Sequence, residues 1–169
     1  MRKLLLILSV LIVSINGFAQ FHIEDRVVYY DLDYLIIGRI QANFDDDMAV
    51  CQYPTGYAFM LLEGDRELIT VYLGETKEQA ISGMKDFISL ATQKVSEKTE
   101  HHLKDIDGND VLMTVFPNDK GYLKNTVRLF CSATNLGSGI ILLNNLNYFN
   151  KILVKYPTVQ FKKRIPAEQ

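Results

Sequence analysis

Alternating apolar and polar positions predict several β-strands in the first half of the chain. Along residues 35–44, apolar side chains at every second position alternate with Arg39, Gln41 and Asn43, which is the pattern of a half-buried strand. Further strands are expected at 48–53, 57–62 and 68–73, with turns at 45–47, 54–56 and 63–66. These segments predict an antiparallel meander, preceded by a short strand within residues 20–33.

A longer period follows the meander and predicts an amphipathic helix over residues 77–96. Thr76 and Gln79 have the spacing of a capping box, in which each side chain bonds the other residue's backbone N–H. Behind them the apolar residues recur at helical spacing and leave the charged residues on the opposite side. This stripe comprises Ala80, Ile81, Met84, Phe87, Ile88, Ala91 and Val95.

The second half repeats the change from strands to a helix. Strands are expected at 101–106 and 111–116, joined by the turn-forming residues 107–110, and at 126–133 and 139–143. A second amphipathic helix is expected to begin at Asn144 or Asn145, which are good helix caps, and to end before Pro157. The tail at 160–169 is polar and carries no apolar face, so we expect it to fray.

The order of these elements predicts an α+β fold in which two amphipathic helices cover antiparallel sheet. Residues 20–160 are expected to form a single domain, and residues 161–169 a polar C-terminal tail. The two halves, 36–96 and 101–156, share the order strands then helix. This order permits a duplicated layout with both helices on one face of a curved sheet.

The first 19 residues have the organisation of a secretory signal peptide. Arg2 and Lys3 precede an apolar run of about 12 residues, whereas a membrane-spanning helix needs about 20. The small residues Gly17 and Ala19 favour cleavage before Gln20. The first cysteine is Cys51, so the mature N-terminus lacks the residue that a lipoprotein anchor requires. We expect an exported protein, periplasmic or extracellular, with no transmembrane segment after cleavage.

Charge and composition exclude some function classes. Without Arg2 and Lys3 the mature chain has 16 basic residues against 20 acidic ones, and it contains no long basic run. Binding to nucleic acid through a basic face is therefore not expected. A hydrophobic content of 48% argues against disorder.

Cys51 and Cys131 are the two cysteines of the chain, one in each half. An exported protein meets oxidising conditions, so the pair predicts a disulfide. By the chain-entropy model, closing a loop of about 80 residues would stabilise the fold by about 4–5 kcal/mol. The alternative is two unpaired, buried thiols that behave as small hydrophobic side chains.

Residues 101–110 contain the candidates for a metal site, which are His101, Asp105, Asp107 and Asp110. Neighbouring residues of a strand point to opposite faces, so His101 and His102 would not share an ion. A calcium loop would need a glutamate where Phe116 stands. A tight turn at 107–108 explains the composition better, and the three aspartates at 45–47 similarly favour a solvated loop over a cation site. We therefore predict no metal or other cofactor.

Sequence motifs for catalysis are lacking. The chain has no Gly-x-Ser-x-Gly elbow and no lysine-containing phosphate loop. An enzyme that uses His101 or His102 with the nearby aspartates is an alternative, but the sequence indicates no reaction.

Tyrosines concentrate near the first predicted hairpins, at Tyr29, Tyr30, Tyr34, Tyr53 and Tyr57. A tyrosine ring can pack while its hydroxyl reaches water, so these residues are the candidate ligand-binding group, although strand packing explains them as well. The sequence thus predicts an exported, non-catalytic binding module for a protein, peptide or glycan of the cell envelope. The other alternative is a structural or assembly subunit that offers strand edges to a partner.

Export makes a direct prediction about the mass of the mature protein. Expression in a secreting host is expected to give a chain that begins at Gln20, because signal peptidase cleaves after Ala19. Intact-mass spectrometry of the exported fraction measures this. An exported chain that keeps Met1 would contradict the prediction.

Overall fold

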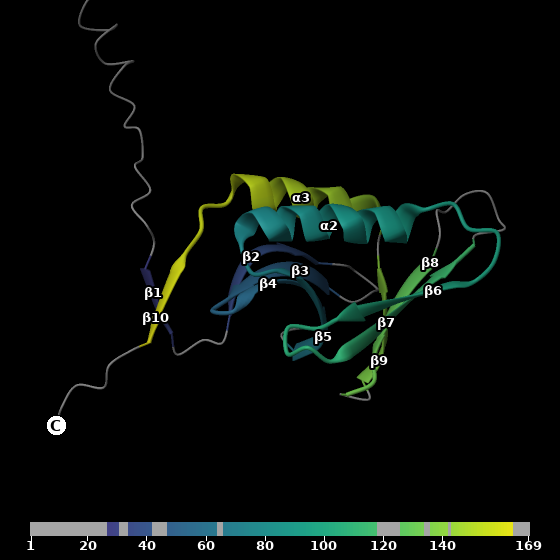
Figure 1. Ribbon diagram of the computed structural model, residues 1–169, viewed down its shortest axis with the longest axis horizontal. Helices are drawn as coiled ribbons and strands as arrows, with labels where there is room; N and C mark the ends of the chain where they lie inside the picture. Colours follow the sequence, from purple (N-terminus) through teal and green to yellow (C-terminus); the bar gives the residue numbers. More distant parts are fainter. Residues whose placement is uncertain are drawn as a thin grey trace, which may run out of the picture.

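The chain forms two antiparallel sheets and two helices, in the order strands, helix, strands, helix (Figure 1). This confirms the predicted α+β class. The structure is a computed structural model and describes residues 27–30, 34–41, 47–63, 66–117, 126–133, 136–141 and 143–163. The predicted signal peptide, residues 1–19, lies outside the described residues.

The first sheet is the predicted meander. Its strands are β2 (Leu35–Ile40), β3 (Asp47–Tyr53), β4 (Gly56–Glu63) and β5 (Arg66–Gly74), which pair in sequence order. Val50 lies opposite Phe59, and Phe59 lies opposite Val71. These three side chains are buried on the same face, so β-branched and aromatic residues build one side of the sheet.

The second sheet contains the later strands and has a clear polar side. Its strands are β6 (Thr99–Lys104), β7 (Asp110–Phe116), β8 (Thr126–Cys131) and β9 (Leu136–Ile141). Burial alternates along β8, where Val127 and Leu129 are buried while Arg128 and Phe130 are exposed. Strand β9 lies a few residues earlier than the predicted 139–143.

Helix α2 (Lys77–Thr92) begins as the capping box predicts. The Thr76 side chain accepts from the backbone N–H of Gln79, and the Gln79 side chain accepts from the backbone N–H of Thr76. The helix ends earlier than the predicted residue 96, because Gln93 leaves the helical conformation at ψ 142°. Among the described helices, none is long and apolar enough to cross a membrane.

The second helical segment is a short 3₁₀ turn, η1 (Leu143–Asn145), followed by α3 (Leu146–Lys155). Asn145 is the N-cap, as one of the two predicted positions, but its side chain makes no capping hydrogen bond. Leu146, Phe149 and Leu153 are buried and form the apolar face of α3.

Both helices lie over the first sheet, side by side (Figure 1). Helix α2 packs on β4 and β5, and α3 packs on β2 and β3. Helix α3, from the second half of the chain, therefore covers strands of the first half. The halves share an order of elements, but they do not pack as two separate units.

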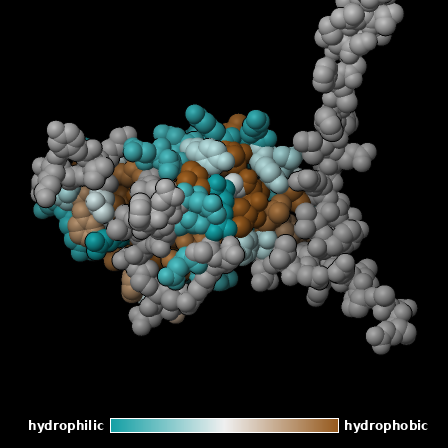
Figure 2. All heavy atoms as spheres, turned by 180° about the vertical axis from the view of Figure 1, so that it is seen from behind, coloured by the Kyte–Doolittle hydropathy of each residue, from teal (hydrophilic) through white to brown (hydrophobic). Residues whose placement is uncertain are grey.

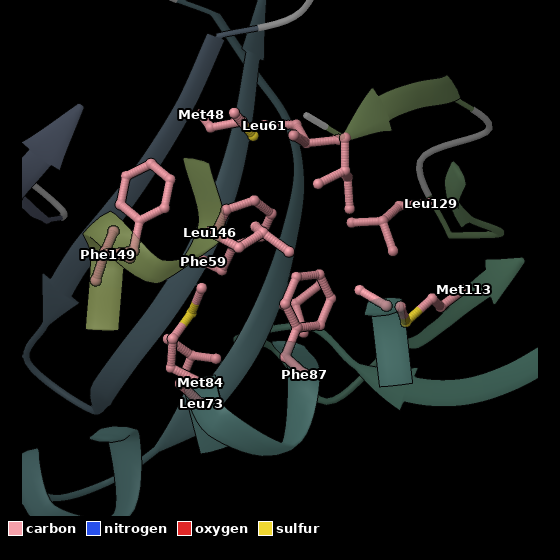
Figure 3. Close-up of a cluster of buried hydrophobic side chains, with 14 of the residues drawn as sticks. Met48, Phe59, Leu61, Leu73, Met84, Phe87, Met113, Leu129, Leu146 and Phe149 are labelled. Carbon is pink, nitrogen blue, oxygen red and sulfur yellow. The ribbon is translucent and has the colours of Figure 1, made fainter. Parts of the chain in front are cut away.

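The main core joins the helices and both sheets around three phenylalanines (Figure 3). The ring of Phe59 lies 5.0 Å from that of Phe87 and 5.7 Å from that of Phe149, measured between centroids. Met113 and Leu129 bring the second sheet into the same cluster. Because these residues come from five elements, a change at one of them affects the whole fold.

A second hydrophobic cluster, the outer cluster, covers the opposite face of the first sheet. It consists of Ala49, Cys51, Tyr53, Ala58, Met60 and Leu62, with Tyr34 and Ile106 packed against it. The backbone N–H of Ile106 also donates to Thr70 Oγ1 at 3.4 Å. The β6–β7 turn thus lies against the outer face, and the first sheet is buried on both sides.

Two short strands from opposite halves of the chain pair with each other, which the sequence pattern did not predict. Strands β1 (Val27–Tyr30) and β10 (Gln160–Lys163) form a two-stranded parallel sheet, in which Val27 lies opposite Gln160 (Figure 1). Fraying was the wrong prediction for residues 160–163. The pairing joins residues more than 130 positions apart, and no local pattern reveals such a contact.

A few large hydrophobic side chains remain partly exposed. Ile36, Phe130, Tyr148 and Val154 are between 38% and 57% exposed. On the face shown in Figure 2, hydrophobic surface is interrupted by hydrophilic residues. Exposed residues of this kind are common on soluble domains and do not by themselves define a binding surface.

The close approach of α2 to β5 yields a stability prediction. A Cβ on Gly83 would lie 2.2 Å from the backbone oxygen of Leu73. Gly83→Ala is therefore expected to lower the free energy of unfolding by about 1–3 kcal/mol, the usual cost of overpacking. The control is Ser82→Ala at the exposed neighbouring position, which should not destabilise the helix. Urea denaturation measures both, and an undiminished stability of Gly83→Ala would contradict the tight helix–sheet contact.

Candidate functional site

Tyr53 and Tyr57 flank the β3–β4 turn but point to opposite faces of the first sheet. Tyr53 belongs to the outer cluster, where its ring lies 5.2 Å from that of Tyr34. Tyr57 belongs to the main core. The turn itself, Pro54 and Thr55, is exposed, so the two tyrosines lie on either side of an exposed turn at the end of the sheet.

A cavity of about 570 Å³ opens at this end, and we call it the tyrosine pocket. Three parts of the chain form its wall: the β3–β4 hairpin, the N-terminus of α2 and the segment that leads into β10. Its lining residues are Gln52, Tyr53, Pro54, Gly56, Tyr57, Glu75, Thr76, Lys77, Glu78, Thr158, Val159 and Phe161. Its volume falls in the range of small-molecule and side-chain sites.

Burial shapes the chemistry of the two tyrosines. The Tyr53 hydroxyl donates to Glu67 Oε2 at 3.3 Å, and burial, followed by the charge of Glu67, raises the pKa of Tyr53. Burial also raises the pKa of Tyr57, an effect that Thr158 partly offsets. The Tyr57 hydroxyl is buried without a partner in hydrogen-bond geometry among the described residues. Both hydroxyls therefore stay protonated near neutral pH.

The N-terminus of α2 contributes the charged part of the wall. Gln79 Oε1 accepts from the backbone N–H groups of Glu75 and Thr76, at 2.9 and 3.2 Å. The Lys77 ammonium donates to the carbonyl of Tyr156 at 2.6 Å. The carboxylates of Glu75 and Glu78 are exposed. The helix start thus uses several of its own donors internally and presents two carboxylates.

The structure places the five tyrosines that the sequence singled out in different surroundings. Tyr53 and Tyr57 line the pocket, and Tyr34 contacts Tyr53 from outside it. Tyr29 and Tyr30 lie in β1, and their side chains are outside the description.

Several lining residues were missed by sequence reasoning. Gln52 interrupts an apolar strand, which is a signal for a buried polar contact, but its partner is 107 residues away. Glu75 precedes the capping box and Glu78 lies within it, and no motif of the sequence marks either residue.

The predicted disulfide is wrong. Cys51 and Cys131 are both free and buried, and they are not within disulfide distance. Cys51 lies in the outer cluster and its thiol contacts Met60 Sδ at 3.9 Å. Cys131 points into the main core from the second sheet, with Sγ 3.8 Å from Asp105 Oδ2. The two residues occupy different sheets and different hydrophobic clusters, so the alternative of two buried thiols holds.

Asp105 organises the β6–β7 turn. Its Oδ1 accepts from the backbone N–H groups of Asp107 and Asn109, at 2.9 and 2.7 Å, and its Oδ2 accepts from Asn109 Nδ2 at 2.9 Å. Gly108 takes the left-handed conformation that the turn requires, at φ 87°. This carboxylate therefore serves a turn, as the simpler interpretation of the sequence proposed.

The remaining metal candidates do not converge. Asp110 is exposed and accepts from Lys104 Nζ at 2.8 Å, which lowers the pKa of Asp110. His101 contacts Gln93 at 2.7 Å, while His102 is exposed on the other face of β6. In the part of the chain that the structure describes, no three His, Cys, Asp or Glu side chains form a group able to hold a metal ion.

The aspartates at 45–47 lie only partly within the described residues. Asp47 begins β3, where its Oδ2 accepts from Arg39 Nη2 at 2.5 Å and from Arg39 Nε at 3.1 Å. This carboxylate therefore stabilises the β2–β3 hairpin by an ion pair. Asp45 and Asp46 are outside the description.

Comparison with known proteins found no matching family model, no matching characterised protein and no matching solved structure. The site is therefore interpreted from its own residues.

The burial of both thiols predicts that they react slowly with alkylating reagents. Cys51 is fully buried, and desolvation, together with the charge of Glu67, raises its pKa to about 12. Because the thiolate is the reactive form, iodoacetamide at pH 8 is expected to leave both cysteines of the folded protein unmodified. In guanidinium, both should react without prior reduction. Mass spectrometry measures the adducts. A mass two hydrogens lower before alkylation would show that the cysteines form a disulfide and would contradict this prediction.

Proposed function

We propose that this protein is an exported, non-catalytic binding module whose ligand site is the tyrosine pocket. The ligand class favoured is a basic side chain of a peptide, an amine on an apolar stem. The observation that supports this most is a pocket whose lining combines three aromatic residues with two exposed glutamates, Glu75 and Glu78, at one helix start.

The polar groups around the pocket disfavour an anion. A helix N-terminus attracts anions through its free N–H groups, but here Gln79 and Thr76 satisfy donors of that first turn. The ammonium of Lys77, which lines the pocket, already donates to the Tyr156 carbonyl. A carboxylate or phosphate ligand would have to compete with these contacts and would face Glu75 and Glu78.

The same surroundings favour a cation. Aromatic rings interact with an ammonium or guanidinium group through their faces, and nearby carboxylates add a Coulomb attraction. Phe161 is the half-buried aromatic residue of the lining, whereas Tyr53 and Tyr57 contribute to the lining while packed into the two hydrophobic clusters. Pro54 and Val159 add apolar surface for a methylene stem, in the way that lysine and arginine bury their stems in proteins.

A titration with a small probe tests the proposal. Nα-acetyl-lysine methylamide is expected to shift the ¹⁵N–¹H resonances of residues 52–57, 75–79 and 158–161. Its Nζ-acetylated form, which has the same stem but no charge, should bind more weakly. Shifts distributed over the whole surface, or equal binding of the neutral form, would contradict a cation site. Shifts in the pocket with N,N′-diacetylchitobiose alone would identify a glycan site instead.

Removal of the carboxylates is the matching mutational test. Glu75→Gln and Glu78→Gln are each expected to weaken binding of the lysine probe by up to about fivefold, the range for exposed charge pairs. The control is Glu97→Gln, which removes the same charge in the exposed segment beyond the other end of α2. Raising the salt concentration should reduce the difference between wild type and variants. Equal affinities for all three variants and wild type would contradict the role of these carboxylates.

A further inference from the structure

The segment between α3 and β10 forms one wall of the tyrosine pocket. Residues 157–159 carry no regular secondary structure, and Thr158, Val159 and Phe161 line the cavity. Val159 is only 2% exposed, so residues 157–159 are docked against the body although they belong to no sheet, and Phe161 lies in β10. We call residues 156–161 the C-terminal segment.

The side chain of Gln52 binds both backbone groups of Val159, the residue at the centre of this segment. Gln52 Nε2 donates to the carbonyl of Val159 at 2.6 Å, and Gln52 Oε1 accepts from the N–H of Val159 at 3.2 Å. The amide of Gln52 thus pairs with the segment as a neighbouring strand would. Lys77 adds a contact at the start of the segment, through the Tyr156 carbonyl.

The contacts of Gln52 favour the docked position of the segment, and they involve only a few residues. Gln52 is 5% exposed, so its amide would lose both partners if the segment left, which is unfavourable for a buried polar group. Release of residues 157–159 would break the contacts of Gln52 and expose Val159, while the pairing of Gln160 and Phe161 with β1 holds the far end of the segment. Local openings of this kind need less free energy than global unfolding.

We propose that Gln52 is a positioning residue for the tyrosine pocket: it latches the C-terminal segment as a movable wall, and release of the segment opens the pocket. This inference rests on the proposed function for its consequence in binding. The latch itself is a property of the free protein and can be measured without any ligand.

Hydrogen exchange of the free protein tests the latch. Gln52→Glu keeps the size of the side chain, but its ionised carboxylate can only accept, so the Val159 carbonyl loses its donor. Amides of residues 158–161 are expected to exchange about tenfold faster than in wild type, the loss of roughly one hydrogen bond. At pH 5 the difference should shrink as the buried carboxyl regains its proton and can donate again.

Two further variants keep the test independent of folding. Gln41→Glu introduces the same change at an exposed position after β2 and should leave exchange in residues 158–161 unchanged. Lys77→Met removes the contact to the Tyr156 carbonyl and should speed exchange at the start of the segment. Amides of β4 and α2 report whether any variant loosens the fold as a whole. If Gln52→Glu exchanged faster throughout the protein, or no faster than wild type in residues 158–161, the proposed latch would be overturned.

Binding of Nα-acetyl-lysine methylamide then tests positioning. In Gln52→Glu, we expect a faster dissociation rate and a weaker affinity, because the wall formed by Val159 and Phe161 is no longer held. A variant with a loosened segment and unchanged probe binding would overturn the positioning role. A wild type that fails to bind the probe would refute the cationic ligand of the proposed function, while the exchange data would still decide for or against the latch.

Discussion

The contact of α2 with the first sheet is the constraint on which the other features depend. Gly83 lets the helix backbone reach Leu73 of β5, at a distance that any larger residue would prevent. At this depth Phe87 stacks against Phe59, and Phe59 contacts Phe149 of α3. The same helix places its N-terminus beside the β3–β4 turn, where the pocket forms. A packing interaction in the core therefore determines where the charged wall of the site lies.

The buried polar side chains of Gln52 and Asp105 differ in how far along the chain their hydrogen-bond partners lie, and therefore in what they stabilise. Each is nearly inaccessible and each satisfies backbone groups. Asp105 bonds residues two and four positions later, so its turn can form early and independently of the rest of the fold. Gln52 bonds a residue 107 positions away, so its hydrogen bonds exist only once α3 has packed on the sheet. The first is a local device for a hairpin, and the second ties the end of the chain to its centre.

Sequence reasoning succeeded where structure is local. The capping box at Thr76, the apolar stripe of α2 and the strand alternation all depend on residues within a few positions of one another. It failed where the partner is distant, at the disulfide and the β1–β10 pairing, and it did not indicate which strands α3 covers. The cysteines show why, since residues of different strands can both be buried and face different clusters. For the site, Tyr53 and Tyr57 were predicted from composition, whereas Gln52 and Val159 required the tertiary fold.

A pocket built from three distant segments links ligand binding to the ends of the domain. Its walls come from the β3–β4 hairpin, the start of α2 and the C-terminal segment, and the last of these continues directly into β10. In the binding module proposed above, a ligand that contacts Val159 or Phe161 would favour the docked segment over the released one, because the site is complete only where all three walls are present. The docked segment in turn holds β10 where β1 can pair with it. A small parallel sheet has little stability of its own, so its pairing is expected to respond to whatever occupies the pocket.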